Sequence, residues 1–329
     1  KLILKDNKYL YDSNKKNMFK YIYLNKCNVC ESTELDKITK IYSSSIPFFE
    51  TYLYLCKTCG YGFLNPTPDK TSYLKINEIW YNKKFSLTPF KKAQVMRTKL
   101  KNILKHERTI HRLKSINHNI KSNHNVLDLG AGYGEMLDRL KVNKIYPHYY
   151  ALEQFKNAQN VIKKKNGNII DENIGENWSK NYQSFFDLVI FRHTLEHLED
   201  INYTISQITD SIKDNGLVYI VVPNFLIDLI ANTRTDFFRP VHLSYFNFFS
   251  LKRLLNNNNL EIIAHGMTGE IWVVCKLCKK TFYDLDINKK EHLNYIMQKE
   301  VVTKVIKKYF FRETWTIFKI YIKRLLDKK

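Results

Sequence analysis

Apolar residues gather in short runs that alternate with amphipathic segments through the middle of the chain. A short apolar run between turn residues is typical of a buried strand, and apolar positions three and four apart are typical of a helix face. Strands are predicted at 125–129, 148–152, 168–170, 186–191, 216–222, 260–264 and 271–277. Helical patterns lie between most of them, which predicts an α/β fold with a mainly parallel sheet covered on both faces.

The last two predicted strands differ from the others in how they are connected. Only a short segment around Gly266–Gly269 separates them, and it is too short for a crossover helix. Strands joined in this way pair antiparallel. We therefore expect an antiparallel hairpin at the end of an otherwise parallel sheet.

Two Cys-x-x-Cys pairs stand near the start of the chain: Cys27 with Cys30, and Cys56 with Cys59. A tight turn presents two sulfurs to one ion, and a second turn completes a tetrahedron. The alternative is four free or disulfide-bonded cysteines, but this spacing fits metal binding in a reducing cytosol. We predict a closed four-cysteine zinc (Zn²⁺) site with a structural role.

A third such pair, Cys275 and Cys278, receives a different interpretation. It falls at the end of the last predicted strand, where residues three apart point to opposite faces. The two sulfurs would then not share an ion, so we expect these residues to be buried as small hydrophobes.

The composition divides the chain into five parts. Asn65-Pro-Thr-Pro68 marks the end of the cysteine region, and apolar residues recur at helical spacing over 91–121. We expect a basic, loosely ordered segment at 1–20, a zinc-binding module at 21–75, a helical linker at 76–120, an α/β domain at 121–280 and a basic helical tail at 281–329.

The chain is strongly basic, with a formal net charge of +21 at pH 7. Such a charge suits nucleic acid, an anionic membrane face or a phosphorylated substrate. However, Lys far outnumbers Arg, which is the residue suited to bidentate phosphate recognition. We interpret most of the charge as compositional. The sequence shows no apolar signal segment, and its most apolar stretch, 217–230, is too short and polar to span a bilayer, so we expect a cytoplasmic protein.

A glycine turn follows the first predicted strand of the α/β domain and contains Gly130, Gly132 and Gly134. A dinucleotide site has the spacing G-x-G-x-x-G and holds a pyrophosphate at the helix N-terminus. Here the third glycine comes one residue early, and Glu135 would repel a pyrophosphate. S-adenosyl-L-methionine (SAM) carries no phosphate, and Asp128 is placed to bind its ammonium group directly or through water.

Glu153 follows the second strand, 148–152. A carboxylate at the end of this strand can accept hydrogen bonds from both ribose hydroxyls of a nucleoside. The alternative is a solvated loop acid. Its place after an apolar strand favours the ligand role.

Together these motifs resemble the class I SAM-dependent methyltransferases. The resemblance covers roughly residues 120–280 and is carried by Asp128–Gly134, Glu153, Phe186–Ile190, Leu195–His197 and Ile212–Gly216. It implies a Rossmann-like seven-stranded sheet with SAM at the carboxyl ends of the strands.

The same resemblance implies roles for individual residues. Gly130, Gly132 and Gly134 would approach the methionyl part of SAM, and Glu153 would bind the ribose. Asp171 or Asn173, after the third strand, would lie near the adenine. Arg192, at the end of the fourth strand, would contact SAM through its backbone.

Two groups of residues qualify for the acceptor side. A hydroxyl acceptor needs a general base, and His suits near-neutral pH. His193, Glu196 and His197 follow the fourth strand, whereas His242 and Tyr245 precede a helix expected at 250–256. His193 and His242 are the candidate bases, with Tyr245 as a supporting donor. The alternative for each His is capping or a hydrogen bond in the core.

The four-cysteine module, ending in Cys59–Pro66, is similar to that of methyltransferases that modify sugars in surface polysaccharide or antibiotic pathways. Sugar C-methyltransferases with this module have Glu before the His that corresponds to His242, and here that position is Val241. We therefore expect O- (or N-) methylation of a nucleotide-activated or lipid-linked sugar.

Three other functions stay open. The chain could be a sugar C-methyltransferase, a non-catalytic SAM-binding partner protein, or an RNA methyltransferase that grips phosphates with its zinc module and basic helices. The scarcity of Arg and the absence of an Asn-Pro-Pro-Tyr-like motif argue against nucleic acid.

The basic tail has one apolar helical face, formed by Phe311, Trp315, Phe318, Ile322 and Leu325. This face could dock on an anionic membrane, which would make the protein peripheral at the inner face of the membrane. Alternatively it packs on the catalytic domain or on the second subunit of a homodimer.

Overall fold

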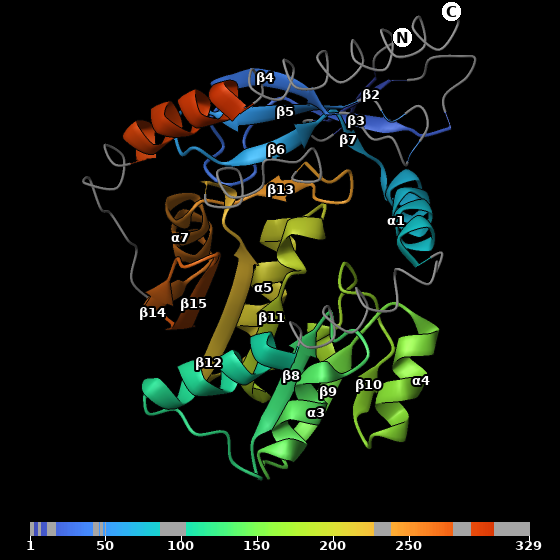
Figure 1. The fold of residues 1–329 in the computed structure, drawn as a ribbon, viewed down its shortest axis with the longest axis vertical. Helices are drawn as coiled ribbons and strands as arrows, with labels where there is room; N and C mark the ends of the chain where they lie inside the picture. Colours follow the sequence, from blue (N-terminus) through green and yellow to red (C-terminus); the bar gives the residue numbers. More distant parts are fainter. Residues whose placement is uncertain are drawn as a thin grey trace, which may run out of the picture.

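The structure is a computed structural model of the chain. It describes residues 3–5, 8–11, 18–41, 46, 49, 51–85, 103–226, 238–278 and 291–305, with only the backbone at 3–5, 8–11 and 81–85. Figure 1 shows two small sheets at the top of the view and a larger sheet with its helices below them.

The larger sheet has seven strands in the order β10-β9-β8-β11-β12-β15-β14. The first five are parallel, and β15 runs antiparallel to both β12 and β14. All seven predicted strands and the antiparallel hairpin are confirmed. Their bounds are β8 (Asn125–Leu129), β9 (His148–Leu152), β10 (Asn168–Ile170), β11 (Phe186–Arg192), β12 (Ile212–Pro223), β14 (Leu260–Gly266) and β15 (Glu270–Leu277).

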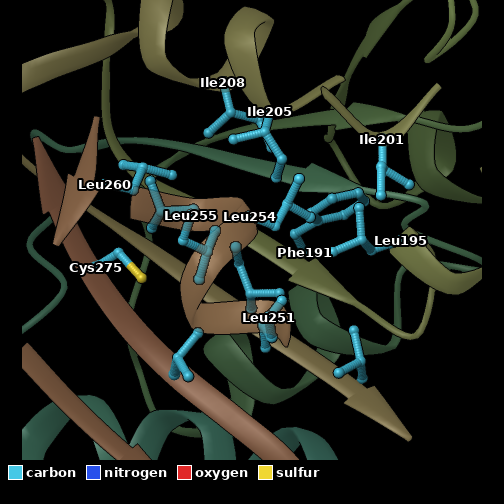
Figure 2. Packing of buried hydrophobic residues seen from close by; sticks show 14 of the residues in the cluster. Phe191, Leu195, Ile201, Ile205, Ile208, Leu251, Leu254, Leu255, Leu260 and Cys275 are labelled. Carbon is cyan, nitrogen blue, oxygen red and sulfur yellow. The ribbon is translucent and has the colours of Figure 1, made fainter. Parts of the chain in front are cut away.

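Helices cover both faces of this sheet, as predicted. Alternate residues of β11 point to opposite faces, so Val189 and Phe191 join one apolar cluster while Leu188 and Ile190 join another. The first cluster includes residues of α5 and α7, whose packing against Phe191 is shown in Figure 2. The second includes residues of α3, α4 and helical residues 103–115. The bounds are α3 (Glu135–Val142), α4 (Lys156–Lys164), α5 (Ile201–Ser211), α7 (Phe248–Asn257) and the 3-10 turns η1 (Ser179–Asn181) and η2 (Leu195–His197).

The N-terminal region supplies every strand of the two small sheets except β13 (Ser244–Tyr245). One has the order β1-β2-β3-β7, and the other has the order β13-β6-β5-β4. The expectation that residues 1–20 are loosely ordered is wrong for 3–5 and 8–11, because these residues pair as strands β1 and β2. The bounds are β1 (Ile3–Lys5), β2 (Lys8–Tyr11), β3 (Tyr21–Leu24), β4 (Leu35–Ile41), β5 (Thr51–Cys56), β6 (Gly62–Asn65) and β7 (Thr67–Pro68).

Two features cross the boundaries expected from the sequence. Helix α1 (Lys70–Phe85) begins before residue 75, and the helix predicted over 91–121 is described from 103 and ends at 115. Strand β13 (Ser244–Tyr245) follows the large sheet's central strands in the chain but pairs antiparallel with β6. The cysteine-bearing region and the α/β domain therefore share a sheet.

A helix at 291–305 packs on the cysteine-bearing region, next to β4 and β5 in Figure 1. The Tyr295 hydroxyl donates to Asp36 Oδ2 at 2.7 Å, and Lys299 Nζ lies 2.7 Å from the same oxygen. The rest of the predicted basic tail, including its apolar face from Phe311 to Leu325, lies outside the described residues. No helix in the described ranges has the length and apolarity that a membrane crossing requires.

Candidate functional site

The glycine turn after β8 has a backbone that other residues adopt only with strain. Gly130, Gly132 and Gly134 have φ of 72°, 56° and 74°. A Cβ on Gly130 would lie 2.3 Å from Thr194 Oγ1, in the loop after β11. The turn therefore packs tightly against that loop, and α3 begins directly after it.

Two buried carboxylates stand beside this turn. Glu153 is 6% exposed and accepts hydrogen bonds from the Gly132 amide at 2.9 Å and the Phe155 amide at 3.0 Å. Asp128 accepts a hydrogen bond from the Tyr149 hydroxyl at 2.6 Å. Burial raises the pKa of Glu153, and it raises the pKa of Asp128 to about 7. The sequence did not single out Tyr149, whose hydroxyl is brought to Asp128 by the pairing of β8 with β9.

The remaining predicted cofactor residues have varied surroundings. Asp171 and Asn173 follow β10 and are exposed, and the Asn173 amide donates to Glu176 at 2.9 Å. The Arg192 side chain turns away to donate to Thr109 Oγ1 at 2.9 Å. This contact leaves the predicted backbone role of Arg192 possible without testing it. The roles of these residues stay predictions.

His193 lies between two carboxylates at the carboxyl end of β11. Its Nε2 is 3.2 Å from Glu270 Oε2, and its Nδ1 is 3.5 Å from Glu196 Oε1. Burial favours the neutral imidazole, but the contacts with Glu196 and Glu270 outweigh it and raise the pKa of His193. The backbone of His193 has φ 49°, which turns the chain out of the strand here.

Glu270 is a site residue that sequence reasoning missed. It is the first residue of β15 and lies opposite Pro223 at the end of β12. Arg112 Nη1 is 3.0 Å from Glu270 Oε1, and Glu270 is 6% exposed. Strand β15 runs antiparallel to β12, so it begins at the edge of the sheet where the parallel strands end. An acidic residue at the first position of such a strand is the sequence signal that could have pointed to Glu270.

Glu196, His197 and His242 come together, although the last is distant in the sequence. One donor atom from each lies within 4.8 Å of the others. His197 Nδ1 donates to the Val241 carbonyl at 2.7 Å, and the rings of His197 and His242 are 4.8 Å apart between centroids. Tyr245 is buried nearby, and its hydroxyl donates to the Arg239 carbonyl at 3.3 Å.

The segment 241–247 connects this site to the cysteine-bearing region. The Leu243 amide donates to the Glu196 carbonyl at 2.8 Å, and the Leu64 amide donates to the Leu243 carbonyl at 3.0 Å. The Asn247 side chain donates to the Gly60 carbonyl at 2.9 Å. The loop that carries Glu196 is thereby tied to β6 and to the second cysteine turn.

The four N-terminal cysteines form a cluster that could hold a metal ion. Cys27 Sγ and Cys59 Sγ are 3.6 Å apart, Cys30 Sγ and Cys56 Sγ are 3.4 Å apart, and all four sulfurs lie within 4.8 Å. Side-chain amides of the α/β domain support the first turn from outside, because Asn202 and Asn257 donate to the carbonyls of residues 28 and 29. The predicted pairing of the two turns is confirmed.

Cys275 and Cys278 form no such cluster within the described residues. Cys275 is fully buried in the apolar cluster between the sheet and α7, as Figure 2 shows, and Cys278 is half-buried after the end of β15. The expected burial as a small hydrophobe is confirmed for Cys275. It is wrong for Cys278, because the strand ends one residue earlier and leaves this side chain partly exposed.

The sequence profile of a methyltransferase domain family matches residues 96–265, which span the glycine turn, the β11 loop and the hairpin strand β14. The chain belongs to this methyltransferase family. It is a SAM-dependent methyltransferase with a Rossmann-like fold, and the glycine turn with Glu153 stands at the carboxyl edge of the sheet where this fold binds its cofactor.

The search of solved structures finds methyltransferases that are similar to this chain. A SAM-dependent methyltransferase from Archaeoglobus fulgidus is 18% identical, with a TM-score of 0.40, over 52% of this chain and 94% of that chain. The 1,6-didemethyltoxoflavin-N1-methyltransferase of Burkholderia thailandensis, with 1,6-didemethyltoxoflavin and S-adenosylhomocysteine bound, is 11% identical, with a TM-score of 0.47, over 73% of this chain and 100% of that chain. A search of curated proteins finds no match.

Proposed function

We propose that this methyltransferase transfers the methyl group of SAM to a hydroxyl of a nucleotide-activated or lipid-linked sugar. The observation that carries the proposal is His193, held between Glu196 and Glu270 at the carboxyl end of β11. A hydroxyl must lose its proton as it attacks the methyl carbon, and an imidazole beside two carboxylates is a strengthened base. His193 is the base, and Glu270 orients its ring.

The cofactor occupies the space over the glycine turn. Glu153 binds the ribose hydroxyls, and Asp128 balances the ammonium of the methionyl part. Both carboxylates are already placed by hydrogen bonds from Gly132 and Tyr149, so little rearrangement is needed on binding. The backbone of Arg192 completes the contact from β11.

A polar cleft supports a sugar as the acceptor. It lies between the cysteine-bearing region and the loop after η2, and polar side chains contribute to its lining: Asn28, Asp200, Asn202 and Ser244. Carboxylate, amide and hydroxyl groups bind sugar hydroxyls. Leu198, which follows His197 in the chain, also lines the cleft.

The cysteine cluster holds a structural zinc ion. A tetrahedral site with Zn–S bonds of about 2.3 Å has sulfurs about 3.8 Å apart. The closest sulfur pairs, at 3.4 and 3.6 Å, fit this geometry once the ion spreads them slightly. With four sulfur ligands no position is left for a substrate, so zinc stabilises the module and with it one wall of the cleft.

The experiment is methyl transfer from SAM labelled in its methyl group to a panel of nucleotide-activated sugars, with the labelled atom of the product identified by NMR. Label on a sugar oxygen, lost in His193→Asn and kept in the exposed-site control His265→Asn, is the expected result. Label on carbon, label on RNA, or no transfer to any sugar despite S-adenosylhomocysteine binding would each overturn the proposal.

A further inference from the structure

The geometry points to a second metal site, formed by Glu196, His197 and His242, that binds a divalent transition-metal cation. The three donor atoms lie within 4.8 Å of one another, and Glu196 and His197 belong to the turn η2 after β11. Two imidazole nitrogens and one carboxylate oxygen are the protein ligands of many mononuclear zinc and iron sites. This donor set is separate from the four cysteines.

Glu196 is the part of the cluster that most needs a cation. It is 1% exposed, and its Oε2 has no hydrogen-bond partner. Its Oε1 faces imidazoles at 3.5 and 3.9 Å, and within the described ranges no lysine or arginine pairs with it. A buried carboxylate oxygen without a partner is costly, so a metal ion at this position would satisfy an atom that the protein leaves unsatisfied.

His197 is oriented as a metal ligand. Its Nδ1 carries the proton, because this nitrogen donates to the Val241 carbonyl at 2.7 Å. The Tyr73 hydroxyl donates to the same carbonyl at 2.8 Å and fixes it further. The other nitrogen, Nε2, is left with a free lone pair and faces Glu196. A ligating histidine that donates its second N–H to a backbone carbonyl is the common arrangement in metalloproteins.

His242 supplies the third donor. It is 7% exposed, its ring stands edge-on to that of His197, and in the described part of the chain the ring makes no hydrogen bond. Burial first, and then the neighbouring imidazole, lower the pKa of His242 well below its ordinary value. Burial likewise lowers the pKa of His197, so both rings are shifted toward the neutral form that binds metals.

The donor types select the kind of cation. Mg²⁺ and Ca²⁺ prefer oxygen ligands, whereas imidazole suits zinc, iron, cobalt and nickel. A tetrahedral site with bonds of about 2.1 Å has donors about 3.4 Å apart, so the side chains close by roughly an ångström on binding. Three protein ligands leave at least one position open. This last step rests on the proposed O-methylation: the acceptor hydroxyl would bind the metal ion at the open position, and the ion would lower the pKa of that hydroxyl.

The test is a titration of Co²⁺ into the full chain after weakly held metal has been removed and one zinc ion per chain confirmed by elemental analysis. We expect one further equivalent of Co²⁺ to bind, with visible bands of nitrogen and oxygen coordination and without the intense near-ultraviolet band of a cobalt thiolate. Glu196→Gln and His242→Ala should each weaken Co²⁺ binding about 100-fold. His265→Ala, at an exposed site, should not change it, and excess Mg²⁺ should not compete.

Circular dichroism and S-adenosylhomocysteine binding show that the variants are folded. No second equivalent, equal binding in all variants, or a thiolate band that reports zinc displacement from the cysteines would overturn the site. Cobalt binding requires no acceptor, so its outcome is independent of the acceptor screen for the proposed function.

Discussion

Gly130 is the residue of the glycine turn that has least space for an added methyl group. Its φ of 72° strains any other residue by about 1–3 kcal/mol, and an added Cβ would meet Thr194 at 2.3 Å. We expect Gly130→Ala to weaken S-adenosylhomocysteine binding at least about tenfold by calorimetry. Gly175→Ala is the matched control, because a Cβ there meets nothing within 4 Å. Equal affinity in both variants would contradict the assigned turn.

At the same scale, Glu270 should set the pH at which His193 works as a base. A base must be neutral, so the rate rises with pH through a pKa that Glu196 and Glu270 hold above the ordinary 6.5. Glu270→Gln removes one of these contacts, so the midpoint of kcat/KM against pH should move to lower pH. Glu261→Gln, at a pair with Lys276 on the distant part of β14, should leave it in place. An unmoved midpoint in Glu270→Gln would mean that His193 is not the titrating group.

Among the elements, helix 291–305 is joined to α7 by a buried ion pair. Glu291 is fully buried and pairs with Arg253 of α7 through both carboxylate oxygens. Arg253→Met would leave this carboxylate buried and unpaired, which costs about 3 kcal/mol. We expect a lower urea midpoint of unfolding for Arg253→Met. Lys304→Met breaks only the exposed pair with Glu300 and should barely move the midpoint, so a similar fall in both variants would refute the argument.

The elements also show what the sequence could and could not predict. Strands β8 to β15 of the large sheet follow from local apolar runs, and the glycine turn and Glu153 follow from their places after β8 and β9. The pairing of β13 with β6, and of β2 with β3, joins segments with no common local pattern. Glu270 reaches His193 only because β15 runs antiparallel beside β12. Contacts of this kind depend on register between distant segments, which periodicity does not encode.

On the scale of the whole molecule, the cysteine cluster and the glycine turn should respond differently to removal of the proposed zinc ion. Segment 241–247 ties the cysteine region to Glu196, whereas the glycine turn rests on β8, β9 and Thr194. We expect Cys30→Ser to lack the proposed zinc ion by elemental analysis and to reduce acceptor turnover at least about tenfold, with S-adenosylhomocysteine affinity changed less than about threefold. Cys278→Ser is the control. A parallel loss of cofactor affinity would show instead that the cysteine region stabilises the entire fold.

The pairing of β13 with β6 has a consequence for how this enzyme can be recombined with its relatives. An N-terminal region transplanted from another methyltransferase would lack the partner strand of β6. That strand, β13, lies about 180 residues downstream, just before helix α7. In a chimera with a single crossover after residue 68, β6 would come from one protein and its partner strand β13 from the other. The piece that can be exchanged as a working unit is discontinuous: it consists of the cysteine region together with residues 238–247, grafted as a pair.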